Sequence, residues 1–309
     1  MVRVVTRDLP TSWQMTTAGA ANVHPIAVDG TFDDCQAIVK TLFGEHAFRD
    51  EVQLSAVNSI NWARIMAQTV YYFTAAAALG APHRPVRFSV PTGNFGDIFA
   101  GYAARCMGLP VERLIIATNS NDILARTLET GLYQPRPVVA TASPSMDIQV
   151  SSNFERLIFE ASGRDSRRVN ALMADFAETG SFELSTAELA AMRAVFSARR
   201  VDETETAATI ARLYRETGYL ADPHTAVGLA AALNELADSS APMIVLATAH
   251  PAKFPDAIEK AAGCVPPVPR RLERALSGRE EFASIDANAG SVRALIRQRS
   301  RIQAIGAHS

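Results

Sequence analysis

The fold is decided by the stretch Val86-Arg87-Phe88-Ser89-Val90-Pro91-Thr92-Gly93-Asn94-Phe95-Gly96-Asp97. Its apolar, β-branched first part predicts a strand over Val86–Val90, and a helical pattern starts at Ile98. The glycines between them let backbone N–H groups approach a phosphate at the start of the helix. The spacing of Gly93, Gly96 and Gly101 is neither the dinucleotide fingerprint nor a Walker A loop, since no Gly-Lys-Ser/Thr follows. An ordinary strand-to-helix turn is the alternative, and the loop alone favours it.

The rest of the chain continues this alternation of strands and helices. Short apolar runs predict further strands at His24–Val28, Leu114–Thr118, Val138–Ala142 and Met243–Thr248. Helix signals stand at Thr31 with Asp34 (a helix through about Phe43), at Ser185 with Glu188, at Asp222-Pro223, and over Thr204–Thr217, which stops at Gly218. Apolar strands separated by helices predict an α/β fold with a mostly parallel sheet covered on both faces.

Polar residues follow three of the predicted strands, where parallel sheets bind ligands. One group is the loop at Gly93–Asp97. The second is Asn119-Ser120-Asn121-Asp122, and the third is Thr248-Ala249-His250-Pro251. Three such groups at strand ends favour a binding site. We expect His250, and likewise His224, to be hydrogen-bonded structural residues rather than proton shuttles.

A fourth group lies at the start of an apolar helix that runs through Ala78. It reads Asn58-Ser59-Ile60-Asn61-Trp62-Ala63-Arg64, and Asn61 and Arg64 share one helix face. Amide, hydroxyl and guanidinium groups near a helix start suit an anion, especially a phosphate. A capped helix with a surface arginine is an equally good interpretation of these residues alone.

The composition excludes several functional classes. The formal net charge is −2, which points to neither a nucleic-acid nor a membrane partner, and the longest apolar stretch, Val70–Leu79, is too short to span a bilayer. The three cysteines, Cys35, Cys106 and Cys264, are scattered and predict neither disulfides nor a metal site, so a cytoplasmic location is the default.

Seven motifs, in order and with matching spacing, resemble threonine synthase. They are Asn58–Arg64, Val90–Asp97, Ala117–Leu124, Ser143–Ile148 (Ser-Pro-Ser-Met-Asp-Ile), Ser151–Arg156 (Ser-Ser-Asn-Phe-Glu-Arg), Asp222-Pro-His-Thr225 and Ala247–Phe254 (Ala-Thr-Ala-His-Pro-Ala-Lys-Phe). The likeness begins near Gln14-Met15-Thr16-Thr17 and runs to about residue 265.

The resemblance implies the fold-type-II architecture of pyridoxal 5'-phosphate enzymes. It places Gly93, Asn94, Phe95, Gly96 and Asp97 around the cofactor phosphate and Thr248 opposite the pyridine nitrogen. It assigns Ser59, Asn61 and Arg64 to the substrate phosphate. The implied reaction is that of a lyase in threonine biosynthesis, which converts O-phospho-L-homoserine and water to L-threonine and phosphate.

This chain departs from the family in one respect that matters for catalysis. The family's Schiff-base lysine, in a Phe-Lys-Asp motif, and its Ser-Gly-Asp-Thr-Gly loop are both absent, so we assign no catalytic residue. The lysines present are Lys40, Lys253 and Lys260, of which Lys253 is the best placed and is better explained as structural. We therefore expect residues 1–309 to be inactive alone. A non-catalytic phospho-ligand-binding remnant and one half of a split enzyme are the alternatives.

The same comparison suggests a division of the chain into three parts. Residues 1–56 are expected to be an incomplete remnant of the family's smaller domain, with an irregular start over the first twenty residues. Residues 57–265 are expected to form the larger α/β domain. Pro266, Pro267 and Pro269 then precede an arginine-rich tail, and residues 266–309 are expected to form a C-terminal helical extension. The oligomeric state is left open.

Overall fold

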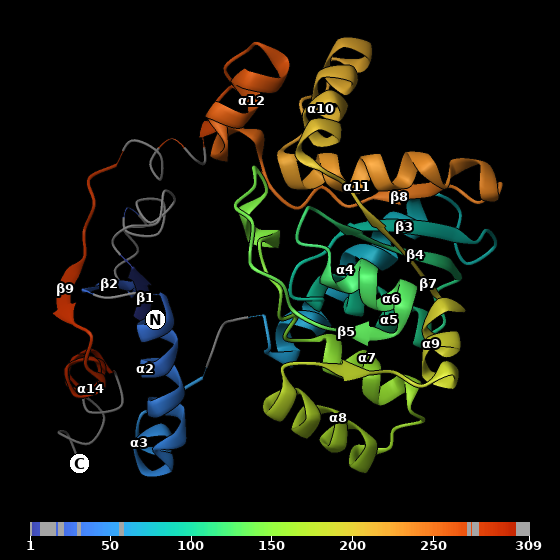
Figure 1. The fold of residues 1–309 in the computed structure, drawn as a ribbon. Helices are drawn as coiled ribbons and strands as arrows, with labels where there is room; N and C mark the ends of the chain where they lie inside the picture. Colours follow the sequence, from blue (N-terminus) through green and yellow to red (C-terminus); the bar gives the residue numbers. More distant parts are fainter. Residues whose placement is uncertain are drawn as a thin grey trace. The chain divides into compact units, whose positions relative to one another are not determined.

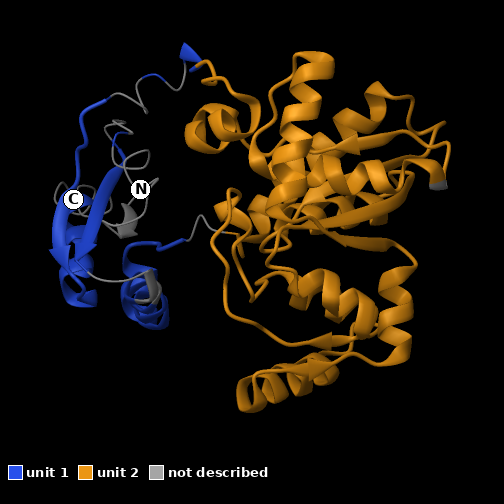
Figure 2. Cartoon of the chain, turned by 45° about the horizontal axis from the view of Figure 1, so that its top comes forward, with its two compact units in different colours: residues 1–56, 268–309 blue, residues 57–267 orange. Residues whose placement is uncertain are grey.

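The computed structural model describes residues 2–6, 17, 22–29, 32–55, 59–270, 273 and 278–300. The chain divides into two compact units, which are coloured separately in Figure 2. Unit 1 contains residues 1–56 and 268–309, and unit 2 contains residues 57–267. Across the described residues, no helix has the length and apolar character needed to cross a membrane.

Unit 1 is built around a three-stranded parallel sheet of order β1-β2-β9 (Figure 1). Its elements are β1 (Val2–Thr6), β2 (His24–Asp29), α2 (Phe32–Gly44), α3 (His46–Glu51), β9 (Ala283–Asp286) and α14 (Ala289–Arg299). The buried side chains of Ile26, Ile38 and Val292 pack in one cluster that joins both ends of the chain.

Both ends of the chain therefore differ from the expectation. The C-terminal segment is not a separate helical extension, because β9 extends the sheet of β2 and α14 packs on the α2 side of the same unit. The start of the chain is not irregular throughout, since Val2–Thr6 form a strand. The expected helix-opening residue Thr31 and the motif residues Gln14, Met15 and Thr16 lie outside the described residues.

Unit 2 holds a four-stranded sheet of order β7-β4-β3-β8, in which all neighbouring strands are parallel (Figure 1). Its strands are β3 (Val86–Pro91), β4 (Val111–Thr118), β7 (Phe196–Arg200) and β8 (Met243–Val245), with a small antiparallel pair of β5 (Leu132–Tyr133) and β6 (Phe182–Glu183). Its helices are α4 (Trp62–Ala78), α5 (Gly96–Cys106), α6 (Ile123–Thr130), α7 (Phe154–Ala161), α8 (Ser166–Thr179), α9 (Thr186–Arg193), α10 (Glu203–Thr217), α11 (Pro223–Asn234) and α12 (Pro255–Ala262). Single 3₁₀ turns are η1 (Pro144–Met146), η2 (Leu236–Asp238) and η3 (Pro251–Lys253).

Helices cover both faces of this sheet, as the apolar strands predict. Along β4, Leu114 and Ile116 pack in the cluster formed with α4 and α5, whereas Ile115 and Ala117 pack in the cluster formed with α11. Successive strand residues point to opposite faces, so a run of four apolar residues fills two cores at once. This burial on both sides explains why β4 is apolar throughout rather than alternating.

The predicted helix boundaries agree with the local chemistry. Ser185 and Glu188 form a reciprocal capping box at α9. Asp222 caps α11 ahead of Pro223. Helix α10 ends at Gly218, which takes a left-handed conformation with φ of 72°.

Two of the strand predictions in unit 2 need correction. The segment 138–142 is a loop because its backbone bonds to side chains instead of a neighbouring strand: Val139 N–H donates to Asn121 Oδ1 and Thr141 N–H to Asp147 Oδ2. The last strand ends at Val245, three residues before Thr248. Strand β7 was not predicted, because its sequence Phe-Ser-Ala-Arg-Arg is polar at one end.

Candidate functional site

The loop between β3 and α5 presents unpaired backbone N–H groups at the carboxyl edge of the sheet. Within the described residues, no protein acceptor receives the N–H of Gly93, Asn94 or Phe95. Their carbonyl groups are engaged instead: Gly93 O accepts from Ser151 Oγ at 2.9 Å, and Asn94 O accepts from the Asn153 backbone N–H at 3.1 Å. Consecutive free N–H groups at a helix start form an anion-binding concavity.

The backbone of this loop is constrained at three positions. Phe95 is buried and caps α5 with φ of 63°, a left-handed conformation that is rare for a residue with a side chain. At Gly93, a Cβ atom would lie 2.7 Å from the Ser145 carbonyl oxygen, and at Gly96 it would lie 3.4 Å from Asn153 Nδ2. A side chain at Gly93 would therefore collide with the neighbouring turn η1 rather than fill a ligand cavity.

The start of α4 lies next to this loop. Asn153 is fully buried and joins the two segments, because its Nδ2 donates to Ser59 O at 2.8 Å and to Asn94 O at 3.0 Å. Arg156 orients Asn153 through a 3.0 Å bond from Nε to Oδ1 and also donates to Ile60 O. Asn61 is the N-cap of α4 and accepts from Ala63 N–H, so this carbonyl oxygen serves the helix. Asn58 itself lies outside the described residues.

Asp97 ties the first turn of α5 to the middle of α4. Its Oδ1 accepts from the hydroxyls of Tyr71 at 2.6 Å and Tyr72 at 3.0 Å. Burial raises the pKa of the Asp97 carboxyl, against these hydrogen bonds and the positive charge of Arg64. Burial and the Asp97 charge raise the pKa of Tyr71 far above its ordinary value, which keeps its hydroxyl a donor. The carboxylate is therefore committed to α4, and the exposed Arg64 lies within electrostatic reach of it.

The polar residues after β4 have a structural task. Asn119 Nδ2 donates to Asp147 Oδ1 at 2.8 Å and to Ser143 Oγ at 3.0 Å. Asn121 Nδ2 donates to Asp147 Oδ1 at 3.0 Å and to Val139 O at 2.8 Å. These buried amides hold the loop 138–147 against the sheet, which leaves them little capacity to bind a ligand.

The segment after β8 reaches the same sheet edge. Leu246 N–H donates to Ser89 O at 3.1 Å, and Thr248 follows as an exposed residue. His250 accepts from Ala252 N–H through Nδ1 and caps η3, a structural role as expected. Lys253, at the end of η3, is exposed. The other lysines, Lys40 on α2 and Lys260 on α12, are exposed as well.

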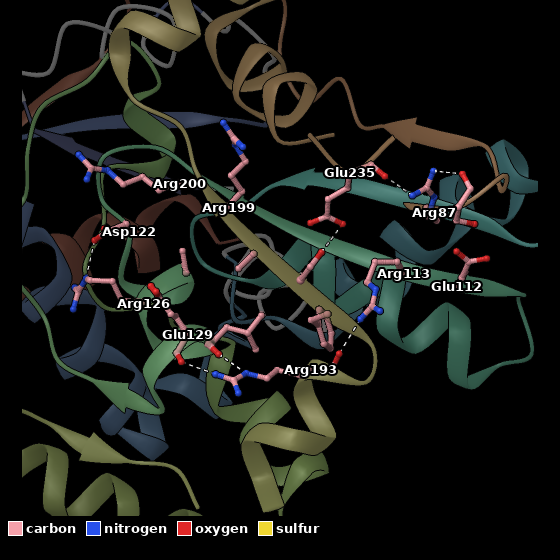
Figure 3. A pocket seen from close by; sticks show the side chains of 16 residues that line it. Arg87, Glu112, Arg113, Asp122, Arg126, Glu129, Arg193, Arg199, Arg200 and Glu235 are labelled. Atoms are coloured by element: carbon pink, nitrogen blue, oxygen red, sulfur yellow. Dashed lines mark hydrogen bonds and ion pairs between the residues drawn. The ribbon is translucent and has the colours of Figure 1, made fainter. Parts of the chain in front are cut away.

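A groove of about 880 Å³ lies along the edge strand β7, and Asp122 is the one residue of the predicted ligand-capable groups among its lining residues (Figure 3). Its arginines are largely engaged by the protein. Arg193 donates to Leu128 O and Glu129 O, Arg113 donates to Arg193 O, and Arg126 pairs with Asp122 at 2.8 Å. Size alone therefore does not make this groove the candidate site.

Tertiary structure adds residues that sequence reasoning did not single out. Ser151, Asn153 and Arg156 connect the loop to α4, and Tyr71 and Tyr72 hold Asp97. The first three stand in the Ser151–Arg156 motif, so their place in that motif was the available signal. The tyrosines lie in an apolar helix, where aromatic residues are normally read as core.

Three comparisons with known proteins lead to one family. A family model described as "Threonine synthase, C-terminal" matches residues 225–296. Threonine synthase of Pseudomonas aeruginosa is 49% identical over 92% of this chain and 61% of its own length, and that of Saccharomyces cerevisiae is 46% identical over 80% and 52%. The pyridoxal-phosphate-bound threonine synthase of Brucella melitensis superposes with a TM-score of 0.89 at 53% identity, covering 96% of this chain and 65% of that one. The yeast enzyme gives a TM-score of 0.84 at 37% identity.

The parallel α/β sheet with this loop at its carboxyl edge defines the fold-type-II class of pyridoxal-phosphate proteins. Serine racemase of maize, at 18% identity and a TM-score of 0.51, shares the fold. Within that class, the chain belongs to the threonine synthase family. It spans 61% of the length of the Pseudomonas relative.

Proposed function

We propose that the chain contributes the phosphate-binding part of a threonine synthase site, which converts O-phospho-L-homoserine and water to L-threonine and phosphate with pyridoxal 5'-phosphate. The observation that carries this proposal is the row of N–H groups at Gly93, Asn94 and Phe95, which find no protein acceptor among the described residues. The relatives named above support the reaction, and the Brucella structure supports the cofactor.

The residues at the sheet edge fit the cofactor's phosphate. The free N–H groups stand at the start of the 11-residue helix α5, whose partial positive charge favours an anion. Thr248 would supply a neutral hydroxyl for the pyridine nitrogen. When bound, pyridoxal phosphate withdraws electrons from the carbons of an amino-acid substrate.

The start of α4 is the proposed site for the substrate's own phosphate. Arg64 is exposed on the first turn of α4, and Asp97 anchors this helix to the loop that begins α5. Arg64 is the charged ligand in the proposal, with Ser59 and Asn61 beside it. A guanidinium at a helix start adds charge-assisted hydrogen bonds to the field of the helix.

The chain's own lysines do not complete such a site. A Schiff-base amine must be positioned and partly desolvated, whereas Lys253, which lies closest in sequence to Thr248, is exposed. Without that amine the proton transfers between substrate carbons also lack their carrier, and general acid–base catalysis is worth roughly 10²–10⁴-fold. We therefore propose that residues 1–309 bind the cofactor and phosphate but do not produce threonine alone.

Two measurements on purified residues 1–309 test this proposal. Titration with pyridoxal 5'-phosphate should give saturable binding that inorganic phosphate competes away, and absence of saturable binding would refute the cofactor site. Incubation with O-phospho-L-homoserine should release no phosphate above the cofactor-only background. Borohydride reduction followed by peptide mapping should find no stoichiometric adduct. An adduct at Lys253, with threonine formation lost in Lys253→Ala, would refute the proposed inactivity.

The proposed location is the cytoplasm. It is supported by three free cysteines, Cys35, Cys106 and Cys264. Unpaired thiols are typical of reducing compartments.

A further inference from the structure

Helix α11 is held close to the strands that lead into the proposed site. Ser89 Oγ on β3 donates to Gly228 O at 2.6 Å. A Cβ atom on Gly228 would lie 3.1 Å from Pro91 Cγ and 3.2 Å from Val245 Cγ1, so glycine permits this tight approach. Because Pro91 ends β3 just before the loop at Gly93, the start of α11 is placed with little freedom relative to that loop.

Asp222, at the start of α11, orients the imidazole ring of His224, and both residues are buried. Asp222 is 1% exposed and His224 is 3% exposed, and Asp222 Oδ1 lies 2.9 Å from His224 Nδ1. Burial alone would raise the pKa of Asp222, but hydrogen bonds from His224 and Thr225 outweigh it and hold this pKa below its ordinary value. The ionised carboxylate only accepts hydrogen bonds, so it selects the tautomer with the proton on Nδ1 and leaves Nε2 as an acceptor.

The other ring nitrogen of His224, Nε2, contacts turn η1, which in turn contacts the loop at Gly93. This nitrogen accepts from the Ser145 backbone N–H at 3.3 Å. The carbonyl oxygen of the same residue, Ser145, would lie 2.7 Å from a Cβ on Gly93. On the other side, the His224 ring packs at 5.0 Å from the ring of Phe254, in the segment that follows Thr248. His224 thus contacts both polypeptide segments that border the proposed site.

We propose that His224 is a positioning residue: through Nε2 it sets the place of turn η1, and η1 sets the place of the N–H groups at Gly93–Phe95. This inference rests on the proposed function for its ligand. The role belongs to one atom, since Nδ1 serves Asp222 and the ring face serves Phe254. A merely structural role would depend on ring packing and on the Asp222 bond, and not on the Ser145 bond.

Two substitutions separate these roles on the full chain. Asn in place of His224 retains a donor near the Nδ1 position but has no acceptor at the Nε2 position, whereas Gln carries its amide oxygen out to the Nε2 position. One hydrogen bond of about 1.4 kcal/mol corresponds to about tenfold in affinity. We expect His224→Asn to weaken binding of pyridoxal 5'-phosphate about tenfold, and His224→Gln to stay within about threefold of the unsubstituted chain.

Amide hydrogen exchange in the absence of ligand gives an independent readout. We expect faster exchange in a peptide covering residues 143–151 for His224→Asn and near-native exchange for His224→Gln. Equal effects of the two variants would overturn the inference, because ring loss would then be the cause. Faster exchange with unchanged affinity would overturn it as well. If the unsubstituted chain binds no cofactor, the proposed function fails. The exchange measurement then decides the inference: unchanged exchange in His224→Asn overturns it, and a change confined to residues 143–151 supports it.

Discussion

Replacement of Gly93 by alanine should destabilise unit 2, because the new methyl group has no room. Its Cβ would lie 2.7 Å from the Ser145 carbonyl oxygen and 3.4 Å from Met146 Cα. Both atoms belong to backbone that the Asn119 and His224 hydrogen bonds hold in place. The turn must therefore move, and overpacking of this kind typically costs about 1–3 kcal/mol.

Gly96→Ala provides a matched control in the same loop. The nearest atom to its Cβ would be Asn153 Nδ2 at 3.4 Å, an ordinary contact, and the position lies at the first turn of α5. Alanine is favoured over glycine in helices by about 0.5–1 kcal/mol, so no loss of stability is expected. At Gly93 the methyl group would lie 2.7 Å from a backbone oxygen, whereas at Gly96 the nearest backbone atom, Ser59 O, is at an ordinary 3.5 Å.

The assay is urea unfolding at neutral pH, followed by circular dichroism and by Trp62 fluorescence. The chain has two tryptophans, so a Trp13→Phe background leaves Trp62 of unit 2 as the single probe. Gly93→Ala should lower the unfolding free energy by about 1–3 kcal/mol, or the midpoint of thermal unfolding by about 2–12 °C. A change below about 0.5 kcal/mol, the usual range for surface substitutions, would refute the argued contact between η1 and the loop.

Three further outcomes follow from the same contacts. Arg64→Ala should weaken binding of O-phospho-L-homoserine by roughly 10- to 150-fold, the equivalent of about 1.5–3 kcal/mol, whereas substitution of the exposed Arg215 on α10 by alanine should leave it unchanged. Equal titration curves for the two variants would exclude the phosphate role of Arg64. Tyr72→Phe should lower the unfolding free energy by about 1 kcal/mol, because the buried hydroxyl donates to Asp97 O at 2.9 Å and Oδ1 at 3.0 Å; an unchanged urea midpoint would contradict this. The Arg168 guanidinium lowers the pKa of Glu188 to about 2, so this pair stabilises the fold above pH about 4.5 and loses its effect as the pH falls toward 2. Glu188→Gln keeps the capping box but should remove about 2 kcal/mol of that pH dependence between pH 6 and 3, and a variant with the full acid sensitivity of the parent would refute the assignment.

Local sequence determined the elements of unit 2 wherever short-range chemistry decides the backbone. Leu114–Thr118 had to be a buried strand because it is apolar on both faces. Ser185 and Asp222 had to begin helices because their side chains satisfy orphan N–H groups within the next few residues. The turn that contains Gly93 could also be predicted from neighbouring residues, because a strand ends just before it and a helix begins just after it.

Local sequence could not decide which residues a strand or a polar side chain would meet far along the chain. Strand β2 pairs with β9, more than two hundred residues later, and neither sequence encodes that choice. Asn119 was predicted as a ligand-capable amide, and Asn153 stood only within the Ser151–Arg156 motif. In the folded chain Asn119 donates a hydrogen bond to Asp147, and Asn153 joins Ser59, 94 positions away in the sequence, to the loop.

The same limit applies to the histidine at the start of α11. Its cap position was visible in Asp222-Pro223-His224, and a structural role followed from that position. Its Nε2 contact with Ser145 spans 79 positions and depends on how closely Gly228 lets α11 approach β3. Helix caps and turns depend on neighbouring residues, so the sequence alone predicts them. The partner of a buried polar atom depends on packing, because only the packed elements bring distant backbone within hydrogen-bond distance.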